Sequence, residues 1–182
     1  MILSMINKRL LIKNLLAYNH ENSFYDKKLR VDLDSREGKA RFLKHICALS
    51  NSNPNNDSFI VIGIEDENNE MLGVDFYDDS RIQNLVNAYL DNPPKILYEN
   101  VSFPHLPKDK VIGLVTISPK ADVSSFKKGI GNIFTGTVYR RIGSNSMPHF
   151  GRFNLKIENT EIVKSIALNS KNSIKDTLDG VV

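Results

Sequence analysis

Four acidic residues stand where a phosphate-processing site could form. Glu21 and Asp26 lie five positions apart at the entrance to an expected strand, and Glu65 and Asp66 directly follow an apolar run. Carboxylates at the strand ends of one sheet can converge on Mg²⁺ or Mn²⁺, which prefer oxygen ligands. Such a cation could polarise a phosphodiester and activate a water molecule. Because acidic residues are also common in solvated turns, the spacing alone leaves both interpretations open.

The basic residues are distributed unevenly along the chain. Residues 119–156 hold seven Lys or Arg and one acidic residue, whereas residues 51–118 hold four and eleven, and the formal net charge is only +3. The 119–156 block is therefore a candidate surface for contacting phosphates, although an ordinary solvated face can have the same composition. The candidate nucleic-acid-binding residues are Lys27, Lys28, Lys127, Lys128, Arg140 and Arg141.

Strand geometry limits which of these residues can act together. Adjacent strand residues point to opposite faces, so only one of Arg140 and Arg141 can face a site. Lys28 shares a strand face with Asp26 and could pair with its carboxylate or with a phosphate beside it.

Several other classes of function receive little support. The glycines at 129, 131 and 143 lack both the Walker pattern and the dinucleotide-binding fingerprint. The four histidines have no ligand-like spacing, which argues against zinc, and His45 is expected to be structural. With a single cysteine, Cys47, no intrachain disulfide can form, which fits a reducing cytoplasm. No apolar run approaches the roughly 20 residues that span a bilayer.

The elements that must position these residues follow from periodicity and turn chemistry. Ser35 is a plausible N-cap, and Pro93 and Pro94 are expected to end a helix. We expect helices over 4–17, 36–50 and 80–91, and strands over 23–32, 59–64, 71–74, 96–103, 110–117 and 137–142. A long loop over 119–135 is expected between the last two strands.

The predicted fold class is α+β, a single domain with a mixed, mostly antiparallel sheet and about three packed helices. We expect an N-terminal amphipathic helix within residues 1–19, the domain itself over 20–156, and a polar, partly disordered C-terminal tail over 157–182. The tail contains one weak amphipathic stretch near Ile162 to Leu168.

Four segments follow one another in the order seen in the Schlafen-type AlbA domain. Glu21 to Lys28 resembles that family's opening Glu-x4-Glu-Phe-Lys element. The segment from Ala48 through Asp66 and on to Val74 resembles its central strand and following turn. The helix over 80–91 also fits, and Tyr139 to Asn145 is similar to its closing Tyr-x-Arg-x-Gly-Ser element.

The resemblance implies a sheet with packed helices that binds nucleic acid. In eukaryotic Schlafens, two such lobes form a clamp that cleaves transfer and ribosomal RNA with three carboxylates and a divalent metal. Carried over by position, those carboxylates are Glu21, Asp26 and the Glu65/Asp66 step. Asp26 is one methylene shorter than the family's Glu, and Lys27 replaces its Phe, so the chain departs from the family's pattern at these two positions.

Three hypotheses follow. The first is a regulatory module, such as a transcriptional regulator, that binds DNA or RNA and needs no cofactor. The second is an endoribonuclease whose Mg²⁺ or Mn²⁺ is held by Glu21, Asp26 and Asp66, with Glu65 as the alternative ligand. The third is a protein-interaction scaffold. We also expect a cytoplasmic homodimer without a membrane segment, because a single lobe would have to dimerise to form a clamp.

Overall fold

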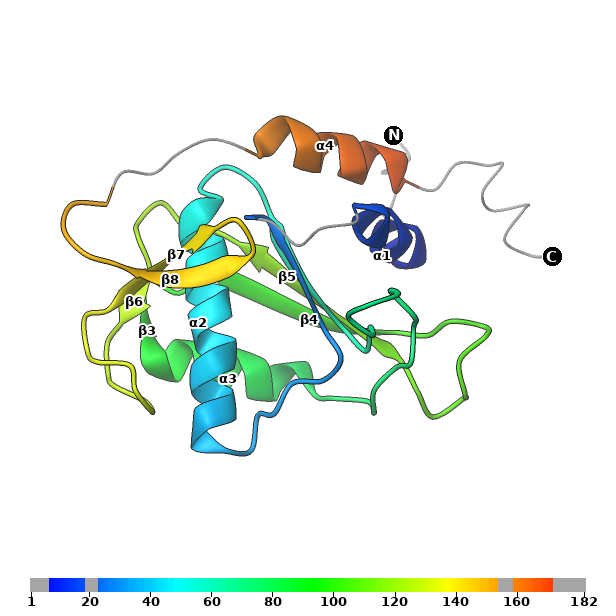
Figure 1. The fold of residues 1–182 in the computed structure, drawn as a ribbon, viewed down its shortest axis with the longest axis horizontal. Helices are drawn as coiled ribbons and strands as arrows, with labels where there is room; N and C mark the ends of the chain where they lie inside the picture. The colour runs from blue at the N-terminus through cyan, green and yellow to red at the C-terminus, as the bar shows by residue number, and fades with distance from the viewer. Residues whose placement is uncertain (1–6, 19–22, 154–158, 172–182) are drawn as a thin grey trace.

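A four-stranded mixed sheet forms the centre of the protein (Figure 1). The structure is a computed structural model, which describes residues 7–18, 23–153 and 159–171. The strands are ordered β1 (Tyr25–Lys28), β2 (Ser58–Ile62), β5 (Ile112–Ser118), β4 (Lys95–Val101). β1 and β2 run parallel, and the other two pairs are antiparallel. The predicted α+β class with a mostly antiparallel sheet is confirmed.

Helices cover both faces of this sheet. They are α1 (Lys8–Ala17), α2 (Arg36–Ser52), α3 (Asp79–Tyr89) and α4 (Thr160–Asn169). Ile60 and Ile62 of β2 lie in the core formed with α2 and α3, whereas Phe59 and Val61 lie in the core formed with α1 and α4. Since successive strand side chains point to opposite faces, the apolar run of β2 serves both layers.

Local sequence signals account for the position of α2. The Ser35 hydroxyl accepts a hydrogen bond of 3.0 Å from the Gly38 N–H, which confirms the expected N-cap. Gly38 itself lies against Asp32. A Cβ at this position would be only 2.2 Å from the Asp32 carbonyl oxygen. The loop before α2 therefore packs directly on the first turn of the helix.

The third helix ends earlier than the prolines predict. The N–H of Leu90 bonds to the Val86 carbonyl oxygen, and the chain then enters the short strand β3 (Leu90–Asp91). This strand pairs with β6 (Ser125–Phe126), which interrupts the loop expected over 119–135. Pairing with a distant segment thus ends the helix before Pro93 is reached.

Other expectations also needed correction. The strand expected over 71–74 is reduced to two isolated bridges, Ile64 with Met71 and Val74 with Val111. The last strand, β7 (Val138–Ile142), continues into an unpredicted partner, β8 (Asn145–His149). The weak amphipathic stretch in the tail forms α4, a fourth helix that packs beside α1. None of the described helices is long and apolar enough to cross a membrane.

A buried asparagine joins α2 to the segments that follow the sheet. Asn51 donates hydrogen bonds of 2.9 Å to the carbonyl oxygens of Ser124 and Tyr139, and its own oxygen accepts one of 2.8 Å from the Ser124 N–H. One turn of α2 is therefore fixed both to the β6 segment and to β7.

We expect Asn51→Ala to lower the free energy of unfolding by about 3 kcal/mol, because three backbone groups lose their buried partner. Urea denaturation followed by circular dichroism measures the change. Asn84→Ala, on the exposed side of α3, is the matched control, with an expected change below about 0.5 kcal/mol. Equal losses in the two variants would contradict this role for Asn51.

Candidate nucleic-acid interface

Asp26 is a fully buried carboxylate surrounded by cationic and polar side chains. Lys28 Nζ lies 3.1 Å from Asp26 Oδ2, and Arg141 Nη2 lies 3.7 Å from Oδ1. His45 Nδ1 lies 3.7 Å from Oδ2 and 2.9 Å from the Ser146 hydroxyl oxygen. We call these five residues the Asp26 cluster. A buried carboxylate needs such partners, since an unpaired charge away from water is costly.

Four separate elements bring the cluster together, with Ser146 supplied by β8. Asp26 and Lys28 share one face of β1, as alternation predicts, and His45 comes from α2. Arg141 arrives on β7, where its N–H donates a 2.8 Å hydrogen bond to the Ser52 hydroxyl at the end of α2. The Arg141 side chain is fully buried, whereas Arg140 lies on the opposite face of the strand. Arg141 thus faces the Asp26 carboxylate, and which of the two arginines contacts a ligand stays a prediction.

Asp26, His45 and Ser146 do not form a hydrolase triad. In a triad, the carboxylate and the nucleophilic hydroxyl contact different imidazole nitrogens, so that a proton can pass through the ring. Here the His45 contacts with Asp26 Oδ2, at 3.7 Å, and with the Ser146 hydroxyl, at 2.9 Å, both involve Nδ1. The contacts of the cluster therefore neutralise the buried Asp26 carboxylate and do not form a proton relay to Ser146.

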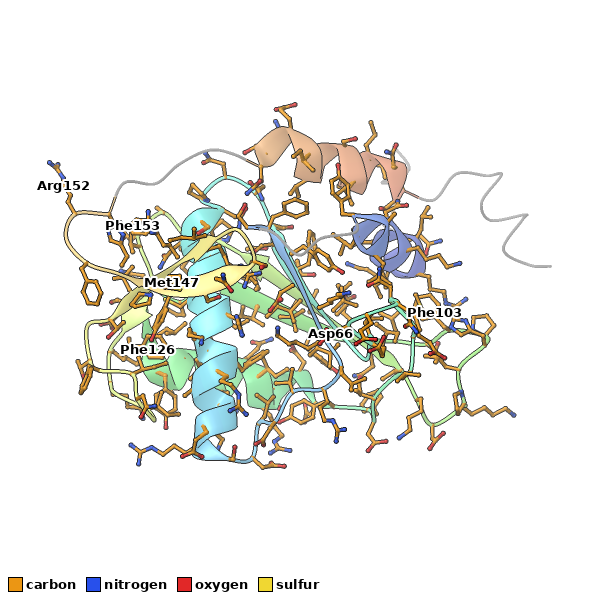
Figure 2. The ribbon with its side chains drawn as sticks, in the orientation of Figure 1. Asp66, Phe103, Phe126, Met147, Arg152 and Phe153 are labelled. Atoms are coloured by element: carbon orange, nitrogen blue, oxygen red, sulfur yellow. The ribbon has the colours of Figure 1, made fainter. Side chains whose placement is uncertain are left out.

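The second acidic pair lies on the turn that follows β2. The Glu65 carboxylate accepts 3.0 Å hydrogen bonds from the N–H groups of Glu67 and Asn68, which lower its pKa. Lys27 Nζ bonds to the Asp66 carbonyl oxygen at 2.6 Å and to the Asn69 side chain. In the view of Figure 2, Asp66 on this turn and Met147 on β8 lie on opposite sides of α2. Among the described residues, no hydrogen bond or ion pair joins either acid to Asp26.

The described carboxylates do not by themselves make a metal site. Asp26 is paired with Lys28 and Arg141, and one Glu65 oxygen caps its own turn. In the described part of the chain, no group of three His, Cys, Asp or Glu residues could hold a metal ion. Glu21 lies outside the described residues, so the three-carboxylate hypothesis stays a prediction.

A basic pocket of about 430 Å³ opens beside the Asp26 cluster. Its charged and titratable lining residues are Lys28, Arg30, Asp32, Arg41 and His45. Lys44, on the same helix as Arg41, lines a neighbouring hollow that also includes Arg41. We call Lys28, Arg30, Arg41 and Lys44 the basic surface. Within the described residues, none of Arg30, Arg41 and Lys44 lies within 4 Å of an acidic group as an ion pair.

Asp32, the acidic residue of the pocket, is hydrogen-bonded within the loop before α2. Asp32 accepts hydrogen bonds from the Ser35 hydroxyl and from the N–H groups of Ser35 and Asp34, and these lower its pKa from 3.8 to about 2. Its charge therefore stabilises the N-cap turn of α2 and persists at neutral pH.

Two other predicted basic residues lie elsewhere. Lys127 and Lys128 are exposed on the segment after β6, where Lys128 Nζ stands 4.4 Å from the centre of the Tyr89 ring at the end of α3. Sequence reasoning missed Arg30, Arg41 and Lys44 as binding candidates, although Arg41 and Lys44 are three residues apart opposite the apolar face of α2. That helical spacing was the available signal.

Comparison with known proteins adds to this geometry. The family model described as Schlafen, AlbA_2 matches residues 21–149. The chain belongs to this family. Membership in the Schlafen AlbA_2 family supports a nucleic-acid-related function at the level of the family. The match includes the Asp26 cluster and the basic surface but excludes α1 and α4.

Among solved structures, this Schlafen AlbA_2 protein is similar to the crystal structure of the DIP2311 protein from Corynebacterium diphtheriae. The two share 13% sequence identity with a TM-score of 0.49, over 79% of this chain and 30% of that chain. The chain thus spans less than a third of the length of that protein. No match was found among curated proteins.

We expect Asp26→Asn to lower the free energy of unfolding by about 3 kcal/mol, because it leaves buried cations facing a neutral amide. Urea denaturation is again the measurement. Asp122→Asn removes the same charge from an exposed loop position and should have little effect. A native-like stability of Asp26→Asn would show that the cluster does not support the fold.

The Asp32 carboxyl should titrate at about pH 2 in the folded protein and shift toward 3.8 in Ser35→Ala. Because its folded pKa is lowered, Asp32 contributes stability above its unfolded pKa, and this is lost as the pH falls through about 2. Carbon-detected NMR of the carboxyl group measures both values. An unchanged pKa in Ser35→Ala would contradict the assigned hydrogen bond.

Proposed function

We propose that this protein binds nucleic acid through the basic surface of Lys28, Arg30, Arg41 and Lys44. The main support is that Arg30, Arg41 and Lys44 border the pockets beside α2 and have no ion-pair partner among the described residues. Phosphates are the natural partners of such a group, because their contact with Lys and Arg releases condensed counterions.

The shape of the site supports this proposal. Arg30, on the segment after β1, and Arg41, on α2, line the same pocket, so a phosphate between them can accept hydrogen bonds from both guanidinium groups. Lys28 adds a third cation and is itself positioned by Asp26. The N-terminal half of α2, whose dipole favours anions at its start, forms one wall.

Family membership supports the nucleic-acid-related part of this function, and the finer features are part of the proposal. These are a regulatory role, the choice between DNA and RNA, and a homodimer that light scattering would test. Lys127, Lys128 and Arg140 line neither pocket beside α2, so they would contact only a strand long enough to reach past the basic surface. Metal-dependent cleavage is the alternative outcome of the experiment below.

We expect the double variant Arg41→Glu, Lys44→Glu to weaken binding to RNA and DNA strands by roughly tenfold or more. Fluorescence anisotropy at several salt concentrations measures the affinity. The slope of log affinity against log salt should fall by about 1.5, because two phosphate contacts are lost. Lys13→Glu, Lys164→Glu is the matched control: it changes the net charge equally at exposed positions on α1 and α4.

If the two double variants lost the same affinity, the loss would come from net charge alone, which would contradict binding at a defined surface. An absence of binding to transfer RNA, single strands and duplex DNA would leave the scaffold interpretation. The same mixtures with Mn²⁺ or EDTA should contain intact RNA. Cutting with Mn²⁺ that is lost in Glu21→Ala would instead establish the nuclease.

A further inference from the structure

A second pocket, of about 490 Å³, lies on the other side of the segment that leaves β1. It is mainly apolar, and its lining includes Leu29, Leu33, Ile82 and two tyrosines, Tyr77 and Tyr98. We call it the tyrosine pocket. Its size and its apolar wall with few polar groups are typical of sites for small organic ligands.

Tyr98 lines this pocket and carries a hydroxyl group. The residue is only 5% exposed, and its ring lies over Gly113, where a Cβ would be 2.6 Å from the tyrosine oxygen. Within the described residues the Tyr98 hydroxyl has no hydrogen-bond partner, since only the backbone N–H of this residue is bonded, to Asp79. The hydroxyl oxygen is not fully buried, so water or a polar group of a ligand can reach it.

The walls of the tyrosine pocket are held in place without a ligand. The Asn100 side chain bonds to both the N–H and the carbonyl oxygen of Tyr77, at 3.0 Å and 2.8 Å. The rings of Tyr77 and Tyr98 meet edge to face, with centroids 6.0 Å apart, and the Arg81 guanidinium lies 4.9 Å from the centre of the Tyr77 ring. A preformed aromatic wall loses little entropy when it binds a flat ligand.

The tyrosine pocket and the basic pocket share a wall. Arg30 and Val31 line both, so an apolar, aromatic hollow adjoins a cationic one. A nucleotide has the same division, with a flat aromatic base and a phosphate on one sugar. A base can stack on tyrosine, and such stacking is a common source of affinity for single strands.

We propose that the tyrosine pocket takes one unpaired base of a nucleic-acid strand whose adjacent phosphate binds at Arg30. This inference rests on the proposed function and specifies its substrate as single-stranded or locally opened nucleic acid. Bases inside a duplex are not accessible to such a pocket, whereas phosphates are. The pocket should therefore make the protein bind strands with exposed bases more tightly than strands that offer phosphates alone.

The test compares a 12-nucleotide RNA strand with the same strand made of abasic residues, both measured by anisotropy at one salt concentration. The native protein should prefer the strand with bases by about tenfold. Leu72→Trp should abolish this preference, because Leu72 lines the pocket, is 44% exposed and can carry a larger ring over the opening. Leu97→Trp is the matched control on β4, at a leucine that is 42% exposed and does not line this pocket.

Tyr98→Phe supplies a second test that keeps the ring and removes only the hydroxyl. It should weaken binding of the base-containing strand by about threefold and leave the abasic strand unchanged. Tyr89→Phe, at the end of α3, is its control.

The outcomes distinguish this inference from the proposed function. If both strands bind the native protein equally, or if Leu72→Trp keeps the native preference, the base pocket is wrong while phosphate binding stands. If neither strand binds, both proposals fail. A preference that is lost in Leu72→Trp but kept in Leu97→Trp supports the assignment.

Discussion

The burial of one carboxylate, that of Asp26, constrains how β1, α2 and β7 are arranged. Asp26 is fully buried, and a charge in that position is tolerated only with close cationic partners. Lys28 satisfies this requirement from the same strand, and Arg141 does so from β7. The pairing with Arg141 requires β7 to lie against α2, which the hydrogen bonds of Asn51 and Ser52 secure. The central sheet, the long helix and the terminal hairpin are thus joined at one charge.

The long helix α2 has two roles that come from its amphipathic pattern. Its apolar side, with Leu43, Ile46 and Leu49, is fully buried in the core, and its other side carries Arg41 and Lys44 beside the pockets. Since the helix is fixed at its start by the Ser35 cap and at its end by Asn51, these cations project from a rigid support. Rigid placement lowers the entropic cost of binding a charged ligand.

Positive charge without an ion-pair partner is the feature of the described part of the site that supports the binding proposal. The buried carboxylate is engaged by Lys28, and after β2 one oxygen of Glu65 accepts hydrogen bonds from its own turn. What remains available is positive charge on one side of the segment after β1 and an aromatic hollow on the other. These two features suit a strand that presents both phosphates and bases. The helices α1 and α4, outside the family match, cover the opposite face of the sheet.

The sequence by itself determined the local features. The apolar run of β2, the Ser35 cap, the shared face of Asp26 and Lys28, and the opposite faces of Arg140 and Arg141 all follow from neighbouring residues. Only the tertiary structure decided that Arg141 and His45 accompany Asp26, that Arg30 and Arg41 line one pocket, and that α3 ends where β3 pairs with β6. Periodicity reports which side of an element is apolar, but convergence depends on the register and packing of elements far apart in the chain.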